Sequence, residues 1–247
     1  MRLPINLSSL SAARLGTAWQ VPAPPGRAWR VTARQHKGPF GAERKRQMHI
    51  ARVTLRSKTP YSQSRNIDPL EHPAKPKETK DAYEERTWSK RLHVDSNGYV
   101  FIPPTAFENA IREAAKRLAI SVPGKGKTLY SKYFEAGIQI PEGITLSVKA
   151  EDVKGERLFV PSDGKPGGGK RVYKRFPRID SWSGGLTIYI FDDIIPESVF
   201  RRVLESSGDL VGIGRFRPQS RGFYGRYSVE SFQWIEDGSA ALAGAAE

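Results

Sequence analysis

Apolar residues alternate with polar ones in several short runs along the middle and end of the chain. The run that begins at Met48 places Ile50, Val53 and Leu55 among polar neighbours, which predicts a half-buried first strand. Other runs that alternate, or that are rich in β-branched and aromatic residues, predict further strands. These runs cover residues 99–102, 143–150, 157–160, 185–191 and 227–235.

Two segments have the apolar spacing of amphipathic helices. The first presents an apolar face made of Phe107, Ala110, Ile111, Ala114 and Leu118. We predict that Thr105 caps this helix in a capping box with Glu108. In the second helix, Val199, Phe200, Val203 and Leu204 share a face. We expect Pro196 at its first position and Gly208 at its C-terminal end.

The segments between these elements are polar or broken by proline. Residues 57–80 contain Pro60, Pro69, Pro73 and Pro76, which predicts a surface loop. From Asp81 we expect the loop to continue into an extended run at 88–94. A second extended run is expected at 129–134.

Charge gives the strongest global signal. The chain of 247 residues carries a net charge of +14, which favours polyanionic partners, nucleic acid ahead of an anionic membrane surface. The absence of cysteine excludes disulfides and thiolate nucleophiles. No apolar run reaches about 18 residues, so we expect no membrane span.

The N-terminal 47 residues differ from the remainder in composition. They hold nine Lys or Arg and one acid, so they carry 9 − 1 = +8 of the net charge. This segment is a disordered basic arm, an organelle transit peptide or an over-extension upstream of Met48. We therefore predict a nucleic-acid-binding domain at 48–237 and a frayed tail at 238–247.

The stretch from Val211 to Val229 combines four glycines, four arginines and four aromatic residues. Glycines allow close backbone approach, arginines neutralise phosphates, and aromatic rings stack on bases. We expect the backbone N–H groups around Gly212, Gly214 and Gly222 to approach phosphates. The predicted nucleic-acid-binding residues here are Gly212, Gly214, Arg215, Arg217, Arg221, Gly222, Phe223, Tyr224, Gly225, Arg226 and Tyr227.

Two other basic segments extend the predicted interface. Residues 122–128 have Gly-Lys-Thr but lack the earlier glycine and the strand–loop–helix context of a phosphate-binding loop, so Lys125 and Lys127 are predicted to follow the backbone of a bound strand. The segment 170–178 interleaves basic and aromatic residues. It contributes Lys170, Arg171, Lys174 and Arg175 to the predicted interface.

The predicted elements run in the order β-α-β-β-α-β from Met48. This order is that of an α+β, ferredoxin-like (RRM-type) core with long loop insertions. The segment Val100–Arg112 resembles the strand-to-helix junction of the RAMP superfamily, whose members form backbones of CRISPR effector complexes. Gly212-Ile-Gly214 and Gly222-Phe-Tyr-Gly225 resemble that family's glycine-rich loop. Arg221 to Tyr227 is also similar to the Arg-Gly-Phe core of RNA-recognition motifs.

The resemblance implies a cytoplasmic, non-catalytic subunit that binds RNA or single-stranded DNA. Its implied protein partners are copies of itself or other effector-complex subunits. We predict no catalytic residue, cofactor, metal or membrane association. If the chain were instead an RNA endonuclease of the same superfamily, its acid–base or metal-binding groups would be His93, His49, Asp192 or Asp193. A viral or mobile-element single-stranded DNA binding or recombination protein and an organelle RNA-associated protein remain alternatives.

Overall fold

A four-stranded antiparallel sheet forms the centre of the computed structural model, which describes residues 48–162 and 169–236. Its strands lie in the order β3-β7-β1-β8. The bounds of these strands are β1 His49–Ser57, β3 Ile138–Gln139, β7 Ser183–Ile190 and β8 Tyr227–Ile235. The predicted arm at 1–47 and tail at 238–247 lie outside the described residues.

Helices and two strand pairs complete the described structure. The helices are α1 Lys80–Thr87, α2 Pro104–Leu118, α3 Ser131–Ala136 and α4 Glu197–Ser206. The strand pairs are β2 Tyr99–Ile102 with β4 Ile144–Lys149, and β5 Lys154–Pro161 with β6 Arg171–Arg178. Short turns of other helix types lie at Trp88–Arg91, Ala150–Asp152, Ser207–Val211 and Pro218–Ser220.

The connections of the central sheet are those of the ferredoxin-like fold. Helix α2 lies between β1 and β3 in the sequence, and α4 lies between β7 and β8. Taken as first to fourth, the core strands lie in the order fourth, first, third, second across the sheet. The predicted α+β, ferredoxin-like class is therefore confirmed. The predicted long insertions are the segment 58–103, which holds α1 and β2, and the segment 140–182, which holds β4 and the β5–β6 hairpin.

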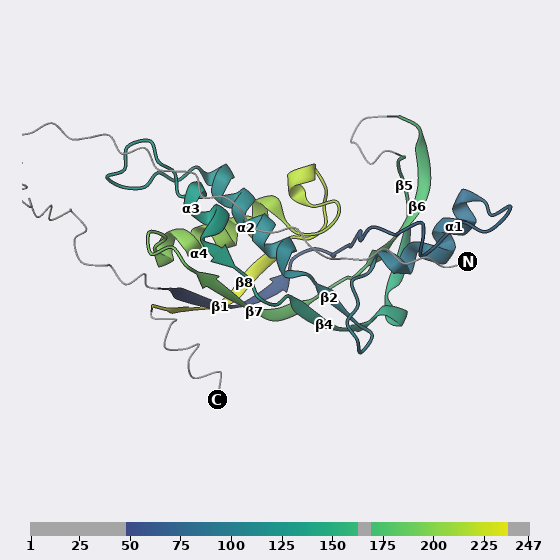
Figure 1. Ribbon diagram of the computed structural model, residues 1–247, viewed down its shortest axis with the longest axis horizontal. Coiled ribbons are helices and arrows are strands. Elements are labelled where there is room, and N and C mark those ends of the chain that lie inside the picture. The colour runs from purple at the N-terminus through teal and green to yellow at the C-terminus, as the bar shows by residue number, and fades with distance from the viewer. Residues whose placement is uncertain (1–47, 163–168, 237–247) are drawn as a thin grey trace, which may run out of the picture. The chain divides into compact units, whose positions relative to one another are not determined.

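The core forms where the apolar faces of sheet and helices meet. On β1, Ala51, Val53 and Leu55 are buried and the arginines between and after them are exposed, as expected for a strand with one covered face. Figure 1 shows α2 and α4 together on the same side of β1, β7 and β8. Phe107 of α2 and Phe200 of α4 are fully buried there. These helices therefore cover one face of the central sheet and leave the other face to solvent.

The second core strand was not predicted. The alternating run at 143–150 does form a strand, β4, but this strand pairs with β2 outside the central sheet. The central sheet instead takes the two residues Ile138 and Gln139 as β3, paired with β7. Two residues are too short to show a period in the sequence, so pairing alone defines this strand.

Three local predictions were wrong. Residues 81–94 do not continue a loop but form α1 and a 3-10 turn, and 129–134 is not extended because α3 begins at Ser131. Thr105 is not the cap of α2, since Pro103 occupies that position without a side-chain bond. Glu108 instead accepts a hydrogen bond from the backbone N–H of Ile140 at 2.9 Å, so it joins α2 to the chain after β3.

The second helix also ends differently. Pro196 is its N-cap, one residue before the predicted position, and Gly208 does not end the helical backbone. The chain continues through a π-helical turn, Ser207–Val211, and stops at Gly212, which has φ of 71°. A side chain at Gly208 would collide with the carbonyl of Tyr227. Glycine at this position therefore lets the π-helical turn pack closely against β8.

We predict that Glu108→Ala lowers the free energy of unfolding by about 1–3 kcal/mol, because the buried N–H of Ile140 loses its acceptor. Urea denaturation measures this change. Arg117→Ala changes an exposed residue of the same helix, so it is the matched control and should change stability by about 0.5 kcal/mol or less. Equal losses in the two variants would contradict the role given to Glu108.

Candidate nucleic-acid interface

The glycine-rich loop, Gly212–Arg226, lies directly against the segment that follows β1. The N–H of Arg215 donates to the carbonyl of Ser62 at 2.8 Å, and the N–H of Gly225 donates to the carbonyl of Pro60 at 2.8 Å. A Cβ at Gly214 would lie 2.4 Å from the Ser62 oxygen. Glycine is therefore required here because the two backbones approach closely.

The backbone N–H groups of this loop are mostly bound within the protein. Gly212 donates to the carbonyl of Ser207 at 2.8 Å, and Gly222 donates to the carbonyl of Arg217 at 3.0 Å. We had expected these two N–H groups to approach phosphates. In this conformation they stabilise the loop, so side chains must supply the contacts to a ligand.

The aromatic residues of the loop divide between the core and the surface. Tyr227 is 1% exposed, and its hydroxyl lies 2.5 Å from the hydroxyl of Ser207, so it cannot stack on a base. The Tyr224 hydroxyl donates to Glu156 of β5 at 2.6 Å. Phe223 is 61% exposed. Of the three predicted stacking residues, Phe223 is thus the accessible one.

The loop arginines point to different surroundings. Arg226 donates from Nε to the carbonyl of Asp209 at 3.1 Å. Arg221 is exposed, and Arg217 is partly exposed. Arg215 lies against the β5–β6 hairpin, so of these four arginines it is the one that joins the loop to the second predicted basic segment.

This junction is built on the ring of Phe176 in β6. The guanidinium carbon of Arg215 lies 3.1 Å from the ring centroid of Phe176, and that of Arg91 lies 5.0 Å from it. Phe216 of the loop also meets this ring edge-on. Cation–π contacts of this kind strengthen when water is excluded. The fold therefore brings the loop and the basic run at 170–178 together.

A polar cavity of about 530 Å³ opens at this junction. Its cationic lining residues come from four separate parts of the chain: Arg65, Arg91, Lys174 and Arg215. Ser64, Asn66 and Ser162 add hydrogen-bonding groups, and Tyr83 and Phe176 add aromatic surface. Such a lining suits an anion that carries a planar group.

The electrostatic state of Arg215 favours an anionic ligand. Burial, together with the like charge of Arg91, lowers the pKa of Arg215 to about 10, although Glu84 partly opposes this shift. Glu84 itself pairs with Arg91 at 2.9 Å. An anion in the cavity would replace the hydration that Arg215 has lost, because a desolvated charge is stabilised by an opposite one.

The remaining predicted residues lie at varying distances from this cavity. Arg175 pairs with Glu85 of α1 at 2.8 Å, and Arg171 and Lys170 lie toward the far end of the hairpin. Lys125 and Lys127 lie in the turn between α2 and α3, which Figure 1 shows at the opposite end of α2 from the glycine-rich loop. The cavity does not include these two lysines. Residues 163–168, in the connection between β5 and β6, lie outside the described residues.

Arg65 and Arg91 were missed by the sequence analysis. Each is one arginine in a polar segment, and nothing in its neighbours distinguishes it from a solvated surface residue. Arg91 is 9% exposed and donates to the carbonyl of Arg175 at 3.1 Å. Arg65 and Arg91 come together only because the chain around them packs against β6 in the folded protein.

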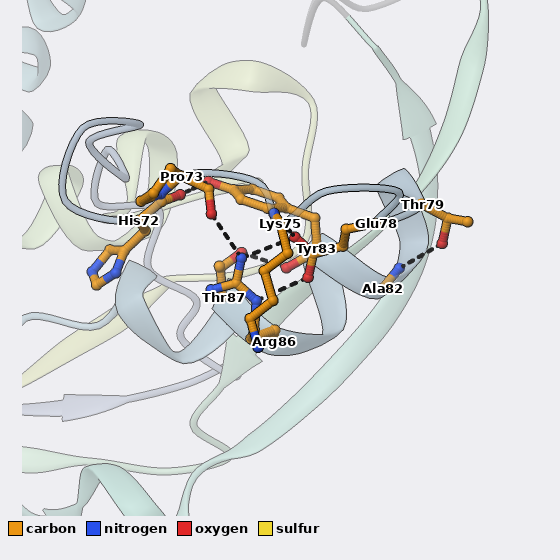
Figure 2. A network of polar contacts seen from close by, with 9 residues as sticks. All are labelled: His72, Pro73, Lys75, Glu78, Thr79, Ala82, Tyr83, Arg86 and Thr87. Atoms are coloured by element: carbon orange, nitrogen blue, oxygen red, sulfur yellow. Dashed lines mark hydrogen bonds and ion pairs between the residues drawn. The ribbon is translucent and has the colours of Figure 1, made fainter.

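A clasp of polar contacts, here defined as residues 72–87, supports one wall of the cavity. Figure 2 shows Arg86 reaching Glu78 and the carbonyl of Pro73, while the Tyr83 hydroxyl donates to the carbonyl of His72. The Glu78 carboxylate also accepts from the N–H of Lys75 at 2.9 Å. The clasp thereby fixes Tyr83, which lines the cavity.

Of the candidate nuclease residues, His49 lies opposite Ile190 of β7, close in the chain to Asp192 and Asp193, whereas His93 lies beside Phe101 of β2. His49 also stacks on Trp234 near the end of β8. Burial and then the charge of Arg65 lower the pKa of His93. Asp192 accepts a turn hydrogen bond from the N–H of Ile194. The described part of the chain contains no cluster of three or more His, Asp or Glu able to hold a metal.

The fold and the site together define a ferredoxin-like α+β protein with a basic, aromatic cavity between its glycine-rich loop and an inserted hairpin. No protein-family model and no curated protein sequence matches the chain. Among the helices of the described residues, none has the length and apolar character needed to cross a membrane.

Two solved structures are similar to this chain at low sequence identity. A structure of the Type III-B Cmr-beta bound to cognate target RNA matches with 12% identity and a TM-score of 0.42, over 77% of this chain and 61% of that chain. Cmr6 from Pyrococcus furiosus matches with 12% identity and a TM-score of 0.41, over 74% of this chain and 98% of that chain. At this identity the likeness concerns the fold alone.

We predict that the Glu78 carboxyl titrates near pH 2 in the intact clasp. The hydrogen bonds from Arg86 and from the N–H of Lys75 lower its pKa from 4.5 to about 2. The contribution of Glu78 to stability is therefore present above about pH 4.5 and is lost as the pH falls toward 2. Carbon-13 NMR titration measures the midpoint.

The matched variant for this titration is Arg86→Ala, which should return the Glu78 midpoint toward 4.5. The amide of Lys75 should then also exchange faster with solvent. A midpoint that stays near 2 in the variant would refute the clasp.

We also predict that Tyr227→Phe lowers the free energy of unfolding by about 1 kcal/mol, since the buried hydrogen bond to Ser207 is lost. The affinity for single-stranded nucleic acid should not change, because the ring lies in the core. Urea denaturation and a binding titration on the same variant check both statements. A large loss of affinity at unchanged stability would restore Tyr227 to the interface.

Proposed function

We propose that this protein binds single-stranded nucleic acid, RNA ahead of DNA, as a non-catalytic subunit of a CRISPR effector complex. The observation that carries the proposal is the junction at Phe176, where Arg215 and Arg91 lie on one aromatic ring beside a cavity that Arg65 and Lys174 also line. Three of these four cations come from outside the glycine-rich loop. The interface is thus a property of the fold.

The chemistry of the cavity suits a phosphodiester strand. Guanidinium groups bind phosphate oxygens through paired N–H donors, and Arg215 is already partly desolvated. The hairpin continues the basic and aromatic surface beyond the cavity through Lys170, Arg171 and Tyr173. A strand that crosses the cavity would therefore meet further cations along β6.

RNA is the first ligand to test because the motif resemblance is to RNA-binding RAMP proteins, and the Cmr-beta structure holds its cognate target RNA. Other subunits of an effector complex, or copies of this chain, are the proposed protein partners. The exposed Phe223 and Arg221 are proposed to contact either the strand or such a partner. Binding is proposed ahead of cleavage because the cavity is lined by cationic, polar and aromatic residues and by none of the candidate residues His49, His93, Asp192 and Asp193.

We predict a salt-dependent affinity for a short labelled single-stranded RNA. If about four phosphates are neutralised, log affinity should fall with log salt at a slope of about −3. Arg215→Ala should weaken binding by about 10- to 100-fold and bring the slope to about −2, because one charged contact is lost. Fluorescence anisotropy at several salt concentrations measures both values.

The matched control is Arg202→Ala, which removes an exposed arginine from α4 and should leave affinity almost unchanged. Competition with DNA of the same sequence tests the preference for RNA, since the 2′-hydroxyl is the group that differs. Affinity that does not depend on salt, or equal losses in the two arginine variants, would refute the proposal. Stronger binding of the DNA competitor would overturn its RNA part.

A further inference from the structure

A second cavity, of about 650 Å³, lies next to the polar one. One wall comes from the segment that carries the clasp and includes Pro69, Ala74 and Tyr83, and the other comes from the hairpin and includes Phe159, Val172 and Tyr173. Its volume falls within the range of small-ligand sites, and most of its surface is apolar, although polar and charged residues complete the lining. The cavity therefore suits a flat, uncharged group.

The two cavities are contiguous. Tyr83, Ser162 and Lys174 line both of them. A ligand held by its anionic part at Arg215 and Lys174 can therefore place an attached planar group in the apolar cavity. A nucleotide has both parts in the required order, since its phosphate and its base are joined through one sugar.

Phe159 and Tyr173 form an aromatic pair that is accessible from the apolar cavity. Their ring centroids lie 4.9 Å apart, and the residues are 51% and 47% exposed. The guanidinium of Arg157 lies 4.1 Å from the Tyr173 centroid, and that of Arg171 lies 5.9 Å from the Phe159 centroid. Exposed aromatic rings flanked by arginines are the usual stacking surface for unpaired bases.

The carboxylates that line this cavity are paired with basic residues. Asp81 pairs with Arg157 at 3.3 Å, and Glu78 pairs with Arg86 at 2.9 Å. Glu84, on the same wall, pairs with Arg91. These ion pairs reduce the repulsion that an approaching phosphodiester strand would otherwise meet.

We propose that the cavity between the clasp and the hairpin receives one unpaired base of the bound strand, stacked against Tyr173 and Phe159. This inference rests on the proposed function, because the phosphate of the same nucleotide occupies the polar cavity. The protein would then hold its strand through charge at one place and through one base at another.

The first test uses 2-aminopurine ribonucleoside 5′-monophosphate, whose fluorescence falls when its base stacks. The full chain should quench it, Tyr173→Phe should retain the quenching, and Tyr173→Ala should lose it. Phe191→Ala removes another partly exposed aromatic residue, 42% exposed, and should quench like the unmodified protein. Absence of quenching by the unmodified protein, or its survival in Tyr173→Ala, overturns the base site.

The second test places one abasic nucleotide at successive positions of a short RNA. One position should weaken binding by about 5- to 100-fold, the range for one stacked base, and Tyr173→Ala should abolish that dependence while the salt slope is kept. If the strand binds with the expected salt slope but no abasic substitution weakens its binding, the base site is refuted and the proposed function is unaffected. Quenching of the mononucleotide without salt-dependent strand binding supports the base site and refutes the strand-binding function.

Discussion

The close approach of two backbones, Gly214 to Ser62 and Gly225 to Pro60, determines the rest of the candidate site. It holds the glycine-rich loop against the chain that leaves β1, and it turns Arg215 toward the inserted hairpin. A side chain at Gly214 would have to displace the Ser62 carbonyl. The glycines of the loop thus allow its backbone to pack closely against the chain after β1, and this packing orients the side chain of Arg215.

The Phe176 ring is the centre of the proposed binding site. Two guanidinium groups share its surroundings, and like charges held close together in a desolvated place are unfavourable unless an anion joins them. The structure keeps Arg91 in place with Glu84 and leaves Arg215 with a lowered pKa. Holding two guanidinium groups close together lowers the stability of the free protein. An anionic ligand between them would offset this loss.

The inserted segments supply most of the proposed binding surface beside the ferredoxin-like core. The core contributes the loop between α4 and β8, and the insertions contribute the clasp, the hairpin and the two adjoining cavities. The clasp is held by polar contacts around Glu78 and not by a hydrophobic face, since Thr87 is the buried residue of α1. Its position therefore depends on local hydrogen bonds and on ion pairs with the hairpin.

The sequence by itself determined the elements with strong periodicity: β1, α2, β7, α4 and β8, and from their order the fold class. It also marked residues 211–229 and 170–178 as basic and aromatic. Only the tertiary structure decided that Ile138 and Gln139 form the second core strand, that Tyr227 is buried, and that Arg65 and Arg91 join Arg215. The physical reason is that periodicity and composition are local, whereas strand pairing, burial and the meeting of charges depend on residues far apart in the chain.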